Sequence, residues 1–108
     1  MQWKNYQEYF RYSLMEMRRT GDFCDVTLAC EDGDVRAHRL VLSTGSSVFS
    51  KMLKSTTAAN KSDHKVQLKG IQKAELNWFL DYIYSGQSVI NQSEIESFLK
   101  KGNLLGLV

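Results

Sequence analysis

The stretch that decides the fold is Cys24-Asp25-Val26-Thr27-Leu28-Ala29-Cys30-Glu31-Asp32-Gly33-Asp34-Val35-Arg36-Ala37-His38-Arg39. Apolar side chains fall at every second position from Cys24 to Cys30, which is the period of a strand with one buried face. The pair Asp32-Gly33 is typical of a tight turn between antiparallel strands. The stretch therefore predicts a β-hairpin over 24–39 with its turn at 32–33, and this register places Asp25 roughly opposite Leu40.

The segments on both sides of the hairpin carry helical and strand patterns. Apolar residues at the helical period predict helices over 6–19 and 73–85, the first through Tyr6, Phe10, Leu14 and Met17. Shorter patterns predict a helix capped by Ser46, a polar mobile loop over 55–64, a strand over 65–69 and a short edge strand over 88–90. A last helix is predicted to begin with a capping box of Asn91 and Glu94 and to turn Ile95, Phe98 and Leu99 toward the core. The order predicts an α+β fold in which a small three-stranded sheet plus a short edge strand packs with about five to six helices.

Length and composition indicate one soluble domain over residues 1–108. The chain is 43% hydrophobic and 24% charged, close to the average of globular domains. Its net charge is +2 and is shared evenly between the two halves, so the basic patch of a nucleic-acid binder is not predicted. No apolar run approaches the roughly 20 residues of a membrane span, and no signal peptide follows Met1. Cys24 and Cys30 lie too far apart in one strand for a disulfide, which fits a reducing intracellular compartment.

Few residues could carry chemistry. Cys24, Cys30, His38 and His64 lack the spacing of a metal site, and the glycines form no phosphate-binding loop. Ser43 and His38 are the nearest candidates for a nucleophile and a base, on sequence proximity alone. We therefore expect no enzyme, no metal and no cofactor, and we interpret His38 as a hydrogen-bonded structural residue.

Two features indicate a protein partner. The helix over 6–19 carries Tyr9, Tyr12 and Met15 outside its apolar stripe, so it is either enclosed in a core or covered by a partner. Asp25 and Arg39 are expected to approach each other at the base of the hairpin, either as a surface ion pair or as a half-buried pair within a docking surface.

The hairpin and the segments after it resemble the BTB/POZ family. The motifs of the resemblance are Asp25-Val26-Thr27-Leu28, then Ala37-His38-Arg39-Leu40-Val41-Leu42, then a helix with Phe49, and later Phe79-Leu80-Asp81-Tyr82-Ile83-Tyr84-Ser85-Gly86. The start, Trp3-Lys4-Asn5-Tyr6, is similar to the arthropod tramtrack-type subgroup, without the F-x-L residues that precede the tryptophan there. The chain also departs from the subgroup at 44–47, where Thr-Gly-Ser-Ser replaces the common A-C-S-P.

The resemblance implies a non-catalytic interaction module that pairs with a second copy of itself. Carried onto matching positions, it assigns the dimer interface to Trp3, Tyr6, Tyr9, Phe10, Ser13, Val41 and Val48. Asp25 and Arg39 match the family's charged pocket, which is associated with dimer integrity and co-repressor binding. For Tyr6 and Phe10, a role inside the core of the chain remains an open alternative.

The resemblance also implies a cellular role. The expected role is homodimerisation, or association with other BTB domains and co-regulator proteins, in a nuclear transcription or chromatin regulator whose zinc fingers bind DNA elsewhere in the protein. The alternative is a cytoplasmic substrate adaptor for a cullin ubiquitin ligase. Such adaptors carry an apolar-x-Glu motif before the third strand, and residues 55–64 contain no glutamate.

Overall fold

The computed structural model describes residues 1–55, 64–104 and 106. The elements follow in the order α1 (Tyr6–Thr20), β1 (Val26–Cys30), β2 (Gly33–Ala37), α2 (Arg39–Gly45), α3 (Ser47–Ser55), β3 (His64–Gln67), α4 (Lys73–Ser85), a 3₁₀ turn η1 (Gln92–Glu94) and α5 (Ile95–Leu104). The α+β class and the three-stranded sheet are confirmed. Most of the loop predicted over 55–64 lies outside the described residues.

The sheet has the strand order β2-β1-β3, with β1 in the centre. β1 runs antiparallel to β2, with Val26 opposite Ala37, and parallel to β3, with Val26 opposite His64. Because Cys30 pairs with Gly33, the two turn residues are Glu31 and Asp32 rather than Asp32 and Gly33. The predicted register was therefore wrong. Continued by one residue beyond Val26 and Ala37, the observed pairing places Asp25 opposite His38 rather than Leu40. The hairpin itself is confirmed.

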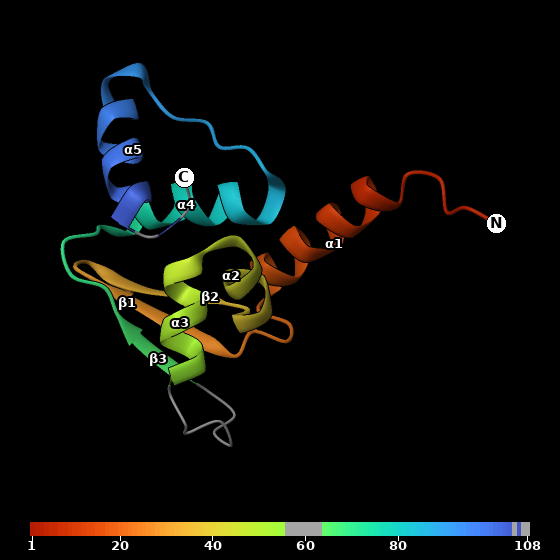
Figure 1. The fold of residues 1–108 in the computed structure, drawn as a ribbon, viewed down its shortest axis with the longest axis horizontal. Helices are drawn as coiled ribbons and strands as arrows, with labels where there is room; N and C mark the ends of the chain where they lie inside the picture. The colour runs from red at the N-terminus through yellow and green to blue at the C-terminus, as the bar shows by residue number, and fades with distance from the viewer. Residues whose placement is uncertain (56–63, 105, 107–108) are drawn as a thin grey trace.

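The core lies between the sheet and the helices α2 to α5. Its fully buried large side chains come from the sheet and from α2, α3 and α4, and they are Phe49, Phe79, Leu28, Leu42, Leu76, Leu80 and Val26. Figure 1 shows α2 and α3 beside the sheet, α4 and α5 stacked beyond them, and α1 extending outward so that its N-terminal half stands away from the other elements. Ser46 caps α3 as predicted, since its Oγ accepts a hydrogen bond from the Phe49 N–H at 3.1 Å.

The segment after α4 differs from the prediction. Residues 88–90 form no strand, and no described strand lies beside them to complete a ladder. Asn91 makes no capping hydrogen bond through its side chain, because the chain first forms η1 and α5 begins only at Ile95. Ile95 and Leu99 are exposed, and only Phe98 of the three predicted side chains is buried.

A capping box that was not predicted forms at the start of α4. The Glu75 carboxylate accepts a hydrogen bond from the Gln72 N–H at 3.0 Å and also bonds Lys101 Nζ at 2.5 Å. This carboxylate therefore stabilises the start of α4 and connects α4 to α5. No helix among the described residues has the length and apolarity needed to cross a membrane.

Candidate protein-interaction surface

Helix α1 differs in its burial from α2, α3, α4 and α5, each of which contains at least two buried residues. None of its residues is buried, although the helix is 15 residues long and begins Tyr-Gln-Glu-Tyr-Phe. Tyr6 is 47% exposed and Phe10 49%, so the alternative that these rings fill the core of a single chain is not supported. Tyr9, Tyr12 and Met15 are exposed as well. The helix therefore presents aromatic surface to solvent on more than one side.

Only one side of α1 is attached to the rest of the chain. Leu14 packs against the core, while Arg11 donates a hydrogen bond to the Ser85 carbonyl at 3.3 Å. One turn further on, the Arg18 guanidinium lies 2.7 Å from the Asp81 carboxylate and 5.1 Å from the centre of the Tyr84 ring. These contacts attach the part of α1 from Arg11 to Arg18 to the rest of the chain, chiefly to α4.

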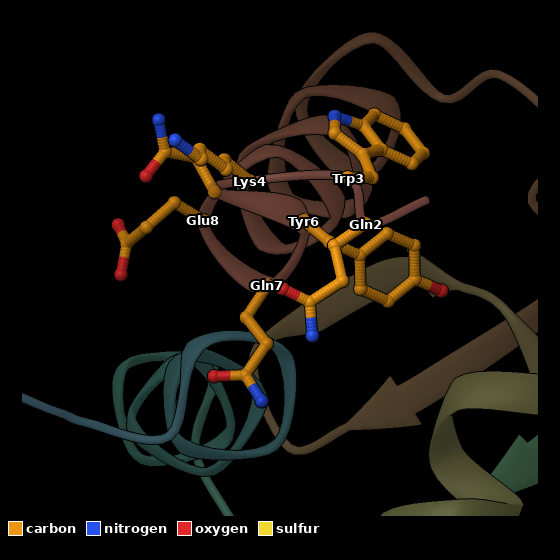
Figure 2. Close-up of a pocket in the computed structure, with 7 residues that line it drawn as sticks. Gln2, Trp3, Lys4, Tyr6, Gln7 and Glu8 are labelled. Carbon is orange, nitrogen blue, oxygen red and sulfur yellow. The ribbon is translucent and has the colours of Figure 1, made fainter.

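The N-terminal residues add to the aromatic surface. The Trp3 ring centre lies 5.0 Å from that of Tyr6 and 5.1 Å from that of Tyr9, and the Tyr6 and Phe10 ring centres are 5.6 Å apart. Figure 2 shows the Trp3 and Tyr6 rings on one side of the first turn and the Lys4 side chain on the other. These three side chains line a shallow hollow of about 630 Å³. We call Trp3, Tyr6, Tyr9 and Phe10 the α1 aromatic cluster.

The remaining residues predicted for a dimer interface lie in different surroundings. Ser13 and Val48 are half-buried, whereas Val41 is buried in the core cluster. The neighbouring Leu40, in the first turn of α2, is instead exposed. The sequence motif contains both residues, and no pattern within it shows which of them faces outward.

Asp25 and Arg39 come together at the base of the hairpin. The Asp25 carboxylate accepts hydrogen bonds from the Arg39 backbone N–H at 2.8 Å and from Arg39 Nε at 2.9 Å. Each side chain is about a third exposed, which makes this a half-buried pair. Burial raises the pKa of Asp25, but the two hydrogen bonds and the charge of Arg39 outweigh burial and leave this pKa below its ordinary value. The contact was predicted, and the pocket's role stays a prediction.

His38 holds the base of the hairpin from inside. It is buried, and its Nδ1 lies 2.7 Å from the Tyr84 hydroxyl, which also accepts the His38 backbone N–H at 2.9 Å. Its Nε2 lies 2.8 Å from the Asp22 carbonyl, so the tautomer with hydrogen on Nε2 satisfies both ring contacts. Burial raises the pKa of Tyr84 to about 12, so its hydroxyl stays neutral. His38 is therefore the structural histidine that was expected.

The described residues show little sign of a reactive centre. No group of three or more potential metal ligands occurs among them. Both cysteines are free thiols, and Cys24 precedes β1 rather than lying within it. Burial raises the pKa of the Cys24 thiol above its ordinary value, which lowers its reactivity.

Comparison with known proteins gives a family match over most of the chain. Residues 14–108 match the family model described as the BTB/POZ domain. The chain is 34% identical to the Broad-complex core protein isoforms of Drosophila melanogaster over 105 residues, which is 97% of this chain and 14% of that protein. It is 28% identical to zinc finger and BTB domain-containing protein 14 of Homo sapiens, over 91% of this chain and 21% of that protein.

Two further similarities come from a different class of protein and from a solved structure. Kelch-like protein 3 of Mus musculus is 30% identical over 88% of this chain and 16% of that protein. The chain therefore spans about a fifth or less of each of these three relatives. The BTB domain of zebrafish PATZ1 has the same fold, with a TM-score of 0.84, 19% identity, and coverage of 99% of this chain and 86% of that one.

Proposed function

Because the chain belongs to the BTB/POZ domain family, we propose that it forms a homodimer through α1 and the start of the α2–α3 segment, as the interaction module of a transcription or chromatin regulator. The BTB domain is a non-enzymatic protein-interaction module, found in transcription regulators and in Kelch adaptors. The proposal takes residues 1–108 as one such domain.

The exposure of α1 carries the proposal. The α1 aromatic cluster consists of Trp3, which precedes α1, and three residues of α1, a helix that its own chain covers on one side only. An exposed apolar patch of this kind is typical of a protein interface. A second copy offers the same patch, and a two-fold axis through α1 would cover both patches at once. The partner we propose is therefore a second copy of this chain, with other BTB domains as related partners.

The charged pair supports a second role. Asp25 and Arg39 satisfy each other and still expose about a third of each side chain, so a partner's polar groups can reach them. We propose co-regulator docking at this pair. The nuclear location and the regulatory role are proposed from the zinc-finger and Broad-complex relatives, with DNA contacted by other regions of the protein.

The alternative role is that of a substrate adaptor for a cullin ubiquitin ligase, which the Kelch-like relative favours. The segment in which such adaptors carry their apolar-x-Glu motif falls largely outside the described residues, and its sequence contains no glutamate. A binding assay with purified cullin distinguishes the two roles. The regulator role predicts no complex at micromolar concentration, and a stable complex would support the adaptor role.

Substitution of the α1 aromatic cluster tests the dimer. We expect Tyr6→Ser combined with Phe10→Ser to convert a dimer into a folded monomer, as measured by sedimentation equilibrium at micromolar concentration. Leu104→Ser is the matched control, because Leu104 is 73% exposed on α5, outside the proposed interface. An unchanged dimer in the α1 variant would contradict the assignment of the interface to α1.

A further inference from the structure

The turn between α1 and β1 presents an exposed aromatic side chain on a strained backbone. Phe23 is 81% exposed, the largest exposed fraction of any phenylalanine, tyrosine or tryptophan among the described residues. Its φ of 63° lies in the left-handed region, which bulky side chains rarely adopt. Both properties raise the free energy of the isolated folded chain, since exposure of an apolar ring to water and strain of the backbone are each unfavourable.

The conformation of this turn is fixed by hydrogen bonds to the buried His38 and to the exposed Arg36. His38 Nε2 lies 2.8 Å from the Asp22 carbonyl on one side of Phe23, and Arg36 donates to the Cys24 carbonyl at 2.7 Å on the other. The Cys24 N–H also donates to the Gly21 carbonyl at 3.2 Å, which closes the turn. Phe23 is thus held outward by hydrogen bonds on both sides rather than by fraying of the chain. Strain that the surrounding structure maintains at an exposed position is typical of a contact site.

The position of Phe23 indicates which partner covers it. The turn begins at Gly21, the C-cap of α1, so it continues directly from the helix of the proposed interface. Asp25, two residues after Phe23, bonds Arg39, and the exposed Leu40 follows Arg39 in the chain. Two exposed apolar residues therefore lie close in sequence to the ion pair, and Leu40 lies in the first turn of α2, which the proposed interface includes.

We propose that Phe23 is a contact with the second copy in the dimer, held in place by the His38–Tyr84 network. The proposal rests on the proposed function, since it needs the dimer to exist. In a symmetric dimer the same contact occurs twice, so both Phe23 rings of the complex become buried against the partner. The strain at Phe23 is then compensated in the assembled dimer, and the network connects the core helix α4 to the interface.

Phe23→Asn tests this contact, because asparagine tolerates a left-handed backbone and removes the ring. Phe23→Gly is a second variant that relieves the strain entirely. We expect both variants to keep the fold, as judged by near-ultraviolet circular dichroism. We expect both to raise the dimer dissociation constant about tenfold or more, because each substitution removes two contacts. Leu104→Ser is again the control and is expected to leave the dissociation constant unchanged.

The outcomes separate this inference from the proposed function. A native dimer whose dissociation constant is unchanged by both Phe23 variants overturns the inference and leaves the dimer in place. A native chain that is monomeric at micromolar concentration overturns the proposed function and this inference with it. Loss of the folded state in Phe23→Gly would also overturn the inference, because it would assign the ring a role within the single chain.

Discussion

Arg39 donates two hydrogen bonds to the Asp25 carboxylate across the base of the hairpin, one from its backbone N–H at 2.8 Å and one from Nε at 2.9 Å. The first bond does not depend on the arginine side chain. The two members of this pair are therefore not equivalent, and substitution separates them.

Arg39→Gln is expected to cost less stability than Asp25→Asn. The glutamine variant keeps the backbone bond to Asp25 and loses an ion pair that is partly exposed, which is worth up to about 1 kcal/mol. The asparagine variant removes the charge to which both donors bond, at a cost of about 1–2 kcal/mol. Urea unfolding of both variants measures the difference. Equal costs would contradict the unequal roles, and unchanged stability together with unchanged mass would reject the importance of the pair.

Acid is expected to remove the folding stability that the ionised Asp25 side chain provides. Its folded-state pKa is lowered, so its contribution to stability is present above the unfolded-state pKa of about 4 and is lost as the pH falls through the folded-state pKa. Glu75 behaves in the same way: burial raises its pKa, but bonds from Lys101 and the Gln72 N–H outweigh burial and lower it. The stability deficits of Asp25→Asn and Glu75→Gln should therefore shrink between pH 7 and pH 3. Deficits that stay constant over this range would contradict the pKa directions.

Tyr84→Phe is expected to destabilise the chain by about 1–3 kcal/mol at pH 7. The substitution leaves the buried His38 N–H and Nδ1 without the hydroxyl that serves both. Tyr82→Phe is the matched control, since Tyr82 is partly exposed on the same helix and should lose at most about 0.5 kcal/mol. Thermal unfolding of both variants checks the difference, and similar losses would argue against the His38–Tyr84 network.

Gly45→Ala is expected to destabilise the packing of α2 against α4. A methyl group at this position would lie 2.6 Å from Cγ2 of Ile83 and 3.4 Å from its Cβ, so the helices must shift. We expect a loss of about 1–3 kcal/mol by urea unfolding. Ile83→Ala creates room, so the double variant should lose less than the sum of the single variants. Additive losses would show that the two positions are not in contact.

The sequence predicts the elements better than it predicts their ends. The predicted bounds of α1 and α4 agree closely with the structure. Both helices have a clear apolar period, and each is followed by a glycine in the left-handed region, Gly21 and Gly86. The hairpin was also predicted, but its turn lies at 31–32 because Gly33 pairs with Cys30. A turn motif indicates that the chain reverses, whereas the exact register depends on side-chain packing across both strands.

Interactions between distant segments were the hardest to predict. The capping residue Glu75 bonds Lys101 on another helix, whereas Asn91 has an ideal local sequence and makes no cap. The same reason explains the absence of a strand over 88–90, since a strand needs a neighbour and local propensity does not supply one. The contact of Asp25 with Arg39 was predicted, whereas the bond of the buried His38 to the Asp22 carbonyl, next to the exposed Phe23, was not.

The mass of the native chain in solution tests the central claim most directly. Multi-angle light scattering at micromolar concentration should give twice the 12.4 kDa of one chain, because α1 needs a second copy to cover it. Dilution should shift the measured mass toward one chain without loss of the folded state. A mass of one chain throughout the micromolar range would contradict the proposed dimer.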